Sequence, residues 1–184
     1  MDTVGDGLEE ALQKAFTRPI PRSAGAQMRY LVKQLKGTRP VAELLGITQR
    51  TVERYVKDQI RKPRPELAER LERQVRGRWQ PQVRARAKKL AATTTGIVID
   101  TRARFGYTAA PGTTDDPRLR HLTVALPPEY AARLFDAQEA GATEPQLRDI
   151  AAEGLGEMYF RDRGRRAQGL DVEFTDVEHV EFDL

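Results

Sequence analysis

The fold of the N-terminal half is decided by residues 40–55, which have the sequence PVAELLGITQRTVERY. This pattern is typical of two short helices that cross at a tight turn. Such helices need a small residue at the crossing, a turn glycine that tolerates a positive φ, and spaced apolar anchors in the second helix. Ala42 and Gly46 meet the first two needs, and the apolar core positions are Val41, Leu45, Ile47, Val52 and Tyr55. We therefore predict a helix-turn-helix over residues 38–57.

Further helices are predicted on both sides of this motif. Residues 25–35 carry apolar side chains at helical spacing, and Gly37 follows as a stop. Residues 65–75 form a second amphipathic segment, with Leu67, Leu71 and Val75 on one face. Residues 79–90 are rich in arginine and interrupted by Pro81, so they form either a bent helix or a connection.

The net charge of +4 is divided unevenly along the chain. Residues 1–105 contain 23 Lys and Arg against 11 Asp and Glu, whereas residues 106–184 contain 8 against 16. A basic surface favours the phosphate backbone of a nucleic acid, because neutralising phosphates releases counterions. The two halves are therefore expected to have different roles.

The predicted second helix of the motif supplies candidate DNA contacts. Thr48 is expected to cap this helix and to contact DNA, and the residues expected to face the groove are Gln49, Arg50, Glu53 and Arg54. Glutamine suits adenine and arginine suits guanine in the major groove, whereas Lys57, Arg61, Lys62 and Arg64 are better placed for phosphates. The alternative is a packing module with a solvated charged face, but the basic excess coincides with the motif and favours DNA binding.

The C-terminal half is predicted to mix strands and helices. Residues 96–105 and 119–126 alternate apolar and polar positions, which indicates a β-hairpin around the loop 106–118. Helices are expected after Pro127-Pro128 and after a cap at Thr143, and residues 170–184 alternate as a further strand or strand pair. The predicted fold class is α+β: a helical DNA-binding domain over residues 1–90, followed by a small α/β domain over residues 91–184 with a β-hairpin and two helices.

Composition argues against several classes of function. The chain has no cysteine and two histidines, and its one serine is Ser23, so a metal site and hydrolase chemistry are not expected. No run approaches the roughly 18 apolar residues of a membrane span, and the acidic N-terminus does not resemble a signal peptide. We expect a cytoplasmic protein that makes no membrane contact.

The hairpin loop contains YTAAPGTTDDP at residues 107–117, which combines turn formers with two adjacent threonines and two aspartates. Taken alone, this composition fits an ordinary exposed connection. Together with the stretch 25–72 and its motif, however, the loop segment 110–116 resembles the terminal proteins, or telomere proteins, of Streptomyces-type linear chromosomes and plasmids. The resemblance covers essentially the whole chain.

The resemblance implies a protein primer rather than an enzyme. In that family a threonine hydroxyl accepts the first nucleotide, so that the protein becomes linked to the 5′ end of the DNA and caps it. In this chain the role falls on Thr114, with Thr113 as the fallback. The protein would need no cofactor of its own, because a DNA polymerase would supply the Mg²⁺ and act on the dNTP. Asp115 and Asp116 are either solvated loop residues or groups that shape the loop, mimic backbone charge or contact a metal.

The resemblance also implies partners and a location. These are telomeric DNA ends, either duplex or single-stranded overhang, a telomere-associated recruiting protein and a DNA polymerase, with the protein held on the nucleoid at replicon ends. The acidic segment 170–184 is an interface for such a partner, an edge blunted by charge, or a mask over the basic half.

Two other functions are weighed. One is a transcriptional regulator with a C-terminal dimerisation or ligand module. The other is a DNA strand-transfer enzyme with Tyr107 as nucleophile. Such an enzyme would need Arg, Lys and His side chains assembled around the tyrosine, and His121 is the one histidine near Tyr107 in sequence.

Overall fold

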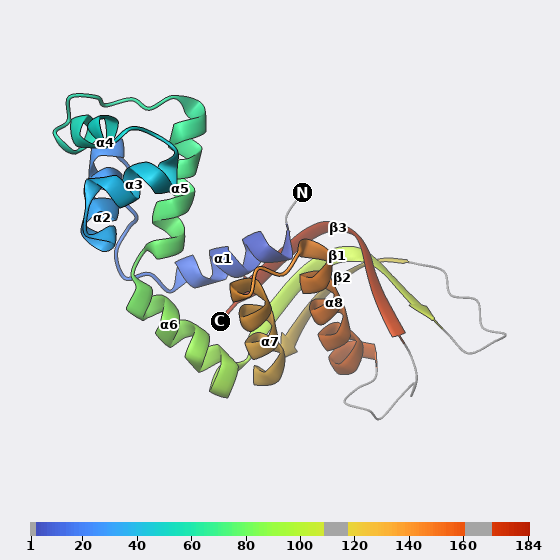
Figure 1. Ribbon diagram of the computed structural model, residues 1–184. Coiled ribbons are helices and arrows are strands. Elements are labelled where there is room, and N and C mark those ends of the chain that lie inside the picture. Colours follow the sequence, from blue (N-terminus) through green and yellow to red (C-terminus); the bar gives the residue numbers. More distant parts are fainter. Residues whose placement is uncertain (1–2, 109–117, 161–170) are drawn as a thin grey trace. The chain divides into compact units, whose positions relative to one another are not determined.

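The computed structural model describes residues 3–108, 118–160 and 171–184 (Figure 1). These residues form α-helices and a three-stranded antiparallel sheet, which confirms the predicted α+β class. The chain divides into two compact units: a helical unit, Phe16–Pro81, and an α/β unit made of Met1–Ala15 and Gln82–Leu184. This division differs from the expected boundary at residue 90, because the first helix and residues 82–90 belong to the α/β unit.

The helical unit contains four helices whose ends follow from local sequence. They are α2 (Ala24–Leu35), α3 (Thr38–Leu45), α4 (Gln49–Val56) and α5 (Pro65–Arg78). The side chains of Ser23 and Thr48 accept hydrogen bonds from backbone N–H groups in the first turns of α2 and α4, which would otherwise lack partners. Pro65 begins α5, where its missing N–H costs nothing.

Each of these helices contributes to one apolar core. Its fully buried members include Met28 and Leu31 of α2, Val41 of α3, Val52 of α4, and Leu71 and Val75 of α5. Burying such a side chain contributes roughly 1.5–3 kcal/mol. Tyr30 and Trp79 pack beside this core with ring centroids 4.7 Å apart, and the Trp79 indole donates a hydrogen bond to the Arg18 carbonyl at 3.0 Å.

The sheet of the α/β unit has the strand order β2-β1-β3, with β1 in the centre. Its strands are β1 (Ile97–Thr108), β2 (Arg118–Leu126) and β3 (Asp171–Asp183). The β1–β2 hairpin and the C-terminal strand confirm the predictions from alternation. Within β1, Ile99 pairs with Val124 of β2 on one side and with Phe182 of β3 on the other.

One face of the sheet is apolar and carries the core of the α/β unit. Along β1, Ile97, Ile99, Thr101 and Ala103 are buried as the alternation predicts, and the Thr101 hydroxyl donates to the His179 carbonyl at 2.9 Å. Three helices complete this core (Figure 1): α1 (Val4–Lys14), α7 (Pro128–Glu139) and α8 (Glu144–Leu155). The expected Thr143 cap of α8 is present as a capping box with Gln146.

The remaining elements are short. Two single-turn π-helices, η1 (Ala91–Thr95) and η2 (Gly156–Phe160), extend α6 and α8. Leu184, which the alternation assigns to the inner face, has 40% of its surface exposed.

Helix α1 was not predicted from the sequence. It buries Val4, Leu8, Ala11 and Leu12 against the sheet and α8. Gly7 makes this approach possible, because a Cβ there would lie 3.0 Å from the Phe182 ring and 3.2 Å from the Val180 carbonyl oxygen. Helix α1 therefore depends on a strand at the other end of the chain.

Residues 81–90 form a helix, α6 (Pro81–Leu90), which begins directly after Gln80 with its positive φ of 45°. No α6 residue is fully buried. Ala87 packs against the core, and ion pairs add to this contact: Arg84 makes two 2.7 Å hydrogen bonds to the Glu9 carboxylate, and Lys88 lies 2.6 Å from Glu139. Two cations of the arginine-rich stretch therefore pair with carboxylates of the protein itself.

Among the described residues, no helix combines the length and apolar character needed to cross a bilayer.

Candidate nucleic-acid interface

The turn between α3 and α4 has the backbone that the sequence predicts. Gly46 adopts φ 62° and ψ 39°, the left-handed conformation that glycine enters without strain. The Gly46 and Ile47 N–H groups donate back to the last turn of α3, the Ile47 bond to the Ala42 carbonyl being 3.0 Å long. Ala42 is 5% exposed, so a small side chain occupies the crossing as expected.

Helix α4 has a buried side and an exposed side. Val52 and Tyr55 are buried in the core of the helical unit, whereas Gln49, Arg50 and Arg54 are exposed. Glu53 is half-buried, and its carboxylate accepts a 2.9 Å hydrogen bond from the Gln49 amide. The structure thus brings the four predicted base-contacting side chains together on the free side of one helix.

Thr48 has a structural role at the start of α4. Its hydroxyl oxygen accepts a 3.3 Å hydrogen bond from the Thr51 N–H and lies 2.9 Å from the Thr51 hydroxyl. Its side chain is also exposed, so the predicted DNA contact by Thr48 remains compatible with the cap.

The C-terminal end of α4 is fixed by residues that the sequence did not reveal. The Arg29 guanidinium donates to the Val56 carbonyl at 2.9 Å and to the Asp58 carboxylate at 2.8 Å. A Cβ on Gly25 would lie 2.1 Å from Asp58 Oδ1, so α2 needs a glycine there for the helices to approach. Gly25, a glycine inside a predicted helix, was the one sequence signal of this close approach.

Positive charge is concentrated around α4 and the segment that follows it. The helical unit contains sixteen Lys and Arg and six Asp and Glu. Six of the cations lie between residues 50 and 64, are exposed, and form no salt bridge with any other described residue: Arg50, Arg54, Lys57, Arg61, Lys62 and Arg64. Asp58, one of two acids in the same segment, is paired with Arg29. The segment therefore carries excess positive charge.

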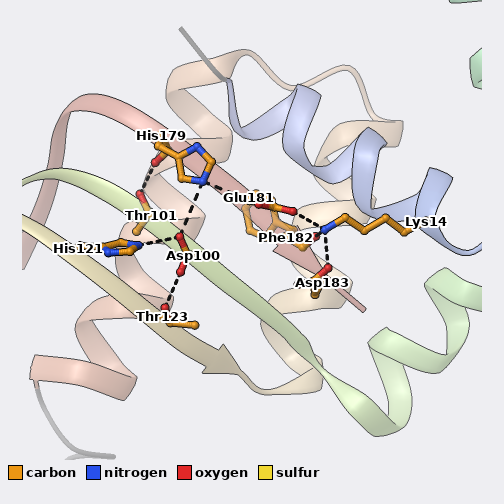
Figure 2. Close-up of polar contacts among 9 residues, drawn as sticks. All are labelled: Lys14, Asp100, Thr101, His121, Thr123, His179, Glu181, Phe182 and Asp183. Carbon is orange, nitrogen blue, oxygen red and sulfur yellow. Dashed lines mark hydrogen bonds and ion pairs between the residues drawn. The ribbon is translucent and has the colours of Figure 1, made fainter.

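A second polar cluster lies on the sheet face opposite the core of the α/β unit. Figure 2 shows Asp100 of β1 between His121 and Thr123 of β2 and His179 of β3. Asp100 accepts hydrogen bonds from Thr123 at 2.5 Å and His121 at 2.9 Å, while His179 Nε2 lies 3.8 Å away. These neighbours, Thr123 first, hold the pKa of Asp100 below its ordinary value of 3.8.

Near this cluster, Lys14 of α1 forms 2.5 Å ion pairs with Glu181 and Asp183 at the end of β3 (Figure 2). These carboxylates raise the pKa of Lys14 above 10.5. No group of three or more potential ligands within the described ranges is arranged to hold a metal ion. The ionisable groups named here on the polar face of the sheet are therefore paired with one another.

The predicted priming residues Thr113 and Thr114, with Asp115 and Asp116, lie outside the described residues. So does the side chain of Tyr107, the nucleophile of the strand-transfer hypothesis. The strands that flank the loop are described: β1 ends at Thr108, and β2 begins at Arg118. His121, the histidine nearest that tyrosine in sequence, is hydrogen-bonded to Asp100.

Comparison of the chain with protein-family models, with curated proteins and with solved structures found no match.

Proposed function

We propose that the helical unit is a helix-turn-helix DNA-binding domain that places α4 in the major groove. The observation that carries the proposal is the left-handed turn at Gly46 followed by a helix whose exposed side bears Gln49, Arg50 and Arg54. Tight packing of α3 on α4, with Ala42 at the crossing, leaves that side free for a groove.

The proposed contacts divide into two kinds. Gln49, Arg50 and Arg54 on the exposed side of α4 are proposed to contact base edges, and Thr48 at the helix start is proposed to contact the DNA backbone. Lys57, Arg61 and Lys62 follow α4 and supply positive charge for phosphates. Phosphate contacts of this kind make affinity fall steeply with salt.

The test is fluorescence anisotropy with a labelled duplex at two salt concentrations. We expect Arg50→Ala/Arg54→Ala to weaken binding by about 100-fold, since both cations face the groove. The matched control is Lys33→Ala/Arg73→Ala, which removes the same charge from exposed positions on α2 and α5. Equal losses in the two double variants would show that net charge, rather than α4, governs binding.

Within this function, we propose that the protein is the terminal protein of a linear replicon and primes DNA synthesis from Thr114. The proposal rests on the family resemblance and is supported by the pairing of β1 with β2, the strands that precede and follow residues 109–117 in the sequence. The Thr114 hydroxyl would lose its proton and attack the α-phosphate of a dNTP. A phosphoester forms and pyrophosphate leaves, with the polymerase supplying Mg²⁺.

Priming is tested by incubating the chain with polymerase-containing extract, labelled dNTP and telomeric template. We expect Thr114→Ala to abolish labelling, Thr114→Ser to retain it because the hydroxyl remains, and Thr113→Ala to retain it. Loss with Thr113→Ala alone would move the attachment to Thr113. The native chain could stay unlabelled in an extract that labels another primer protein, and yet bind duplex DNA. That result would favour the transcriptional regulator.

The proposed partners are the telomeric DNA end, a telomere-associated recruiting protein and the DNA polymerase. Strand β3 lies at an edge of the sheet and alternates acidic with apolar residues, which supports a role in binding one of the protein partners. The proposed location is the nucleoid at the ends of the replicon.

A further inference from the structure

The hydrogen bond between Gln49 and Glu53 determines what α4 presents to DNA. The Gln49 Nε2 donates to Glu53 Oε1 at 2.9 Å, one helical turn away. An ionised carboxylate accepts hydrogen bonds and donates none, so the amide nitrogen, not the amide oxygen, must face Glu53. The Gln49 Oε1 and the second Nε2 hydrogen are left for another partner.

This orientation discriminates between the two purines. In the major groove adenine offers an acceptor, N7, beside a donor, the N6 amino group, whereas guanine offers two acceptors, N7 and O6. A glutamine amide with one free N–H and one free oxygen matches adenine in both positions. Against guanine its oxygen would face O6, and two acceptors would oppose each other.

We infer that Glu53 is a positioning residue that locks the Gln49 amide to select adenine at one position of the bound duplex. The inference rests on the proposed DNA binding by α4. It also revises the role of Glu53, which the sequence predicts as a base contact. Glu53 is half-buried and its carboxylate is already bonded, so it acts through Gln49.

The lock predicts an unusual pair of effects for Glu53→Gln. The substituted amide can donate or accept, so Gln49 can rotate and the preference for adenine over guanine should fall. Removing a negative charge beside the six unpaired cations should at the same time raise affinity for DNA of any sequence by a few fold. A purely structural role for Glu53 would lower affinity and leave base preference unchanged.

The experiment selects bound duplexes from a random library with the full chain, followed by anisotropy on the enriched sequence. One A·T pair is then replaced by G·C at each enriched adenine in turn. We expect the native protein to lose about tenfold in affinity at one position, as for a good bidentate contact. Gln49→Ala and Glu53→Gln should reduce that loss to less than twofold at the same position. Gln34→Ala, an exposed glutamine of α2, is the matched control and should leave it unchanged.

The outcomes separate the inference from the function on which it rests. If the native chain binds no duplex, the proposed DNA binding fails and the inference falls with it. If the native chain enriches a sequence and Gln49→Ala keeps every adenine preference, DNA binding stands and the adenine assignment is overturned. If Glu53→Gln alone keeps the tenfold discrimination, Gln49 selects adenine without the lock and the positioning role of Glu53 is overturned.

Discussion

Charged side chains are used differently in the two units of this protein. In the α/β unit, cations from several elements are paired with carboxylates across the fold, among them Lys14, Arg84, Lys88, Arg102 and Arg133. In the helical unit, the six cations from Arg50 to Arg64 have no such partner among the described residues. Ion pairs link elements in both units, as Arg29 and Asp58 do in the helical one, but the group of six exposed cations without a described partner lies around α4.

This comparison can be tested because the single tryptophan, Trp79, lies in the helical unit. Its fluorescence reports unfolding of that unit, whereas circular dichroism reports both. A substitution in the α/β unit should therefore move the dichroism transition and leave the Trp79 transition in place, and a substitution in the helical unit should move both.

The largest effect is expected in the core of the α/β unit. Phe182 is 1% exposed and contacts Gly7 of α1, so Phe182→Ala should cost roughly 3–5 kcal/mol through lost burial and a cavity. Urea unfolding followed by dichroism measures this loss. Leu119→Ala, at a position 43% exposed on β2, is the control and should change stability by less than about 0.5 kcal/mol. A Trp79 transition that shifts as far as the dichroism transition would mean that the units unfold together.

An intermediate effect is expected at the turn of the helical unit. Gly46→Ala places a Cβ 3.5 Å from Arg70, an ordinary contact, so its cost is the left-handed backbone, about 1–2 kcal/mol. The control has the opposite sign: Gly77→Ala in α5 meets nothing within 4 Å and should stabilise the unit by about 0.5–1 kcal/mol. Thermal unfolding observed through Trp79 distinguishes the two. Equal destabilisation by both would argue against strain at Gly46 as the cause.

The smallest effect concerns the polar face of the sheet. The hydrogen bonds from Thr123 and His121 lower the pKa of Asp100, so the stability they contribute is fully present above the ordinary carboxyl pKa. It is lost as the pH falls through the lowered folded-state value. Asp100→Asn should therefore cost about 1 kcal/mol at neutral pH, and the difference from the native chain should shrink below about pH 4.

Urea unfolding between about pH 2 and 7, followed by dichroism, measures this difference. Asp149→Asn, at an exposed position on α8, is the control and should follow the native curve. A gap between Asp100→Asn and the native chain that is as wide at the acid end as at neutral pH would contradict the assignment.

The helical unit was predictable from sequence because its signals are local. Thr48 caps α4, Gly46 turns the chain, and the apolar spacing in each helix matches the buried residues. What escaped prediction is the support of α4 by Arg29 and Asp58, which are far apart in sequence. The bond from Gln49 to Glu53 was also missed, although its spacing of four residues is the helical one.

The α/β unit was less predictable because part of it depends on distant residues. Its hairpin and capped helices follow from alternation and Thr143, but α1 contains two glycines and packs against Phe182. The arginine-rich residues 79–90 contribute to the basic excess of residues 1–105, yet Arg84 is bonded to Glu9 and Lys88 to Glu139. Net charge along a sequence does not distinguish internal ion pairs from a surface for DNA.

The α/β unit is discontinuous in sequence, and this has a consequence for synthesis on the ribosome. The helical unit is one contiguous segment, so all of its core residues have emerged once α5 is complete. Helix α1 emerges before it but must wait for β3, the last strand, before Leu8 and Leu12 can be buried against Phe182 and its neighbours. Contacts of such long sequence separation form slowly. The order of folding thus reverses the order of synthesis for α1, which is made first and packed last.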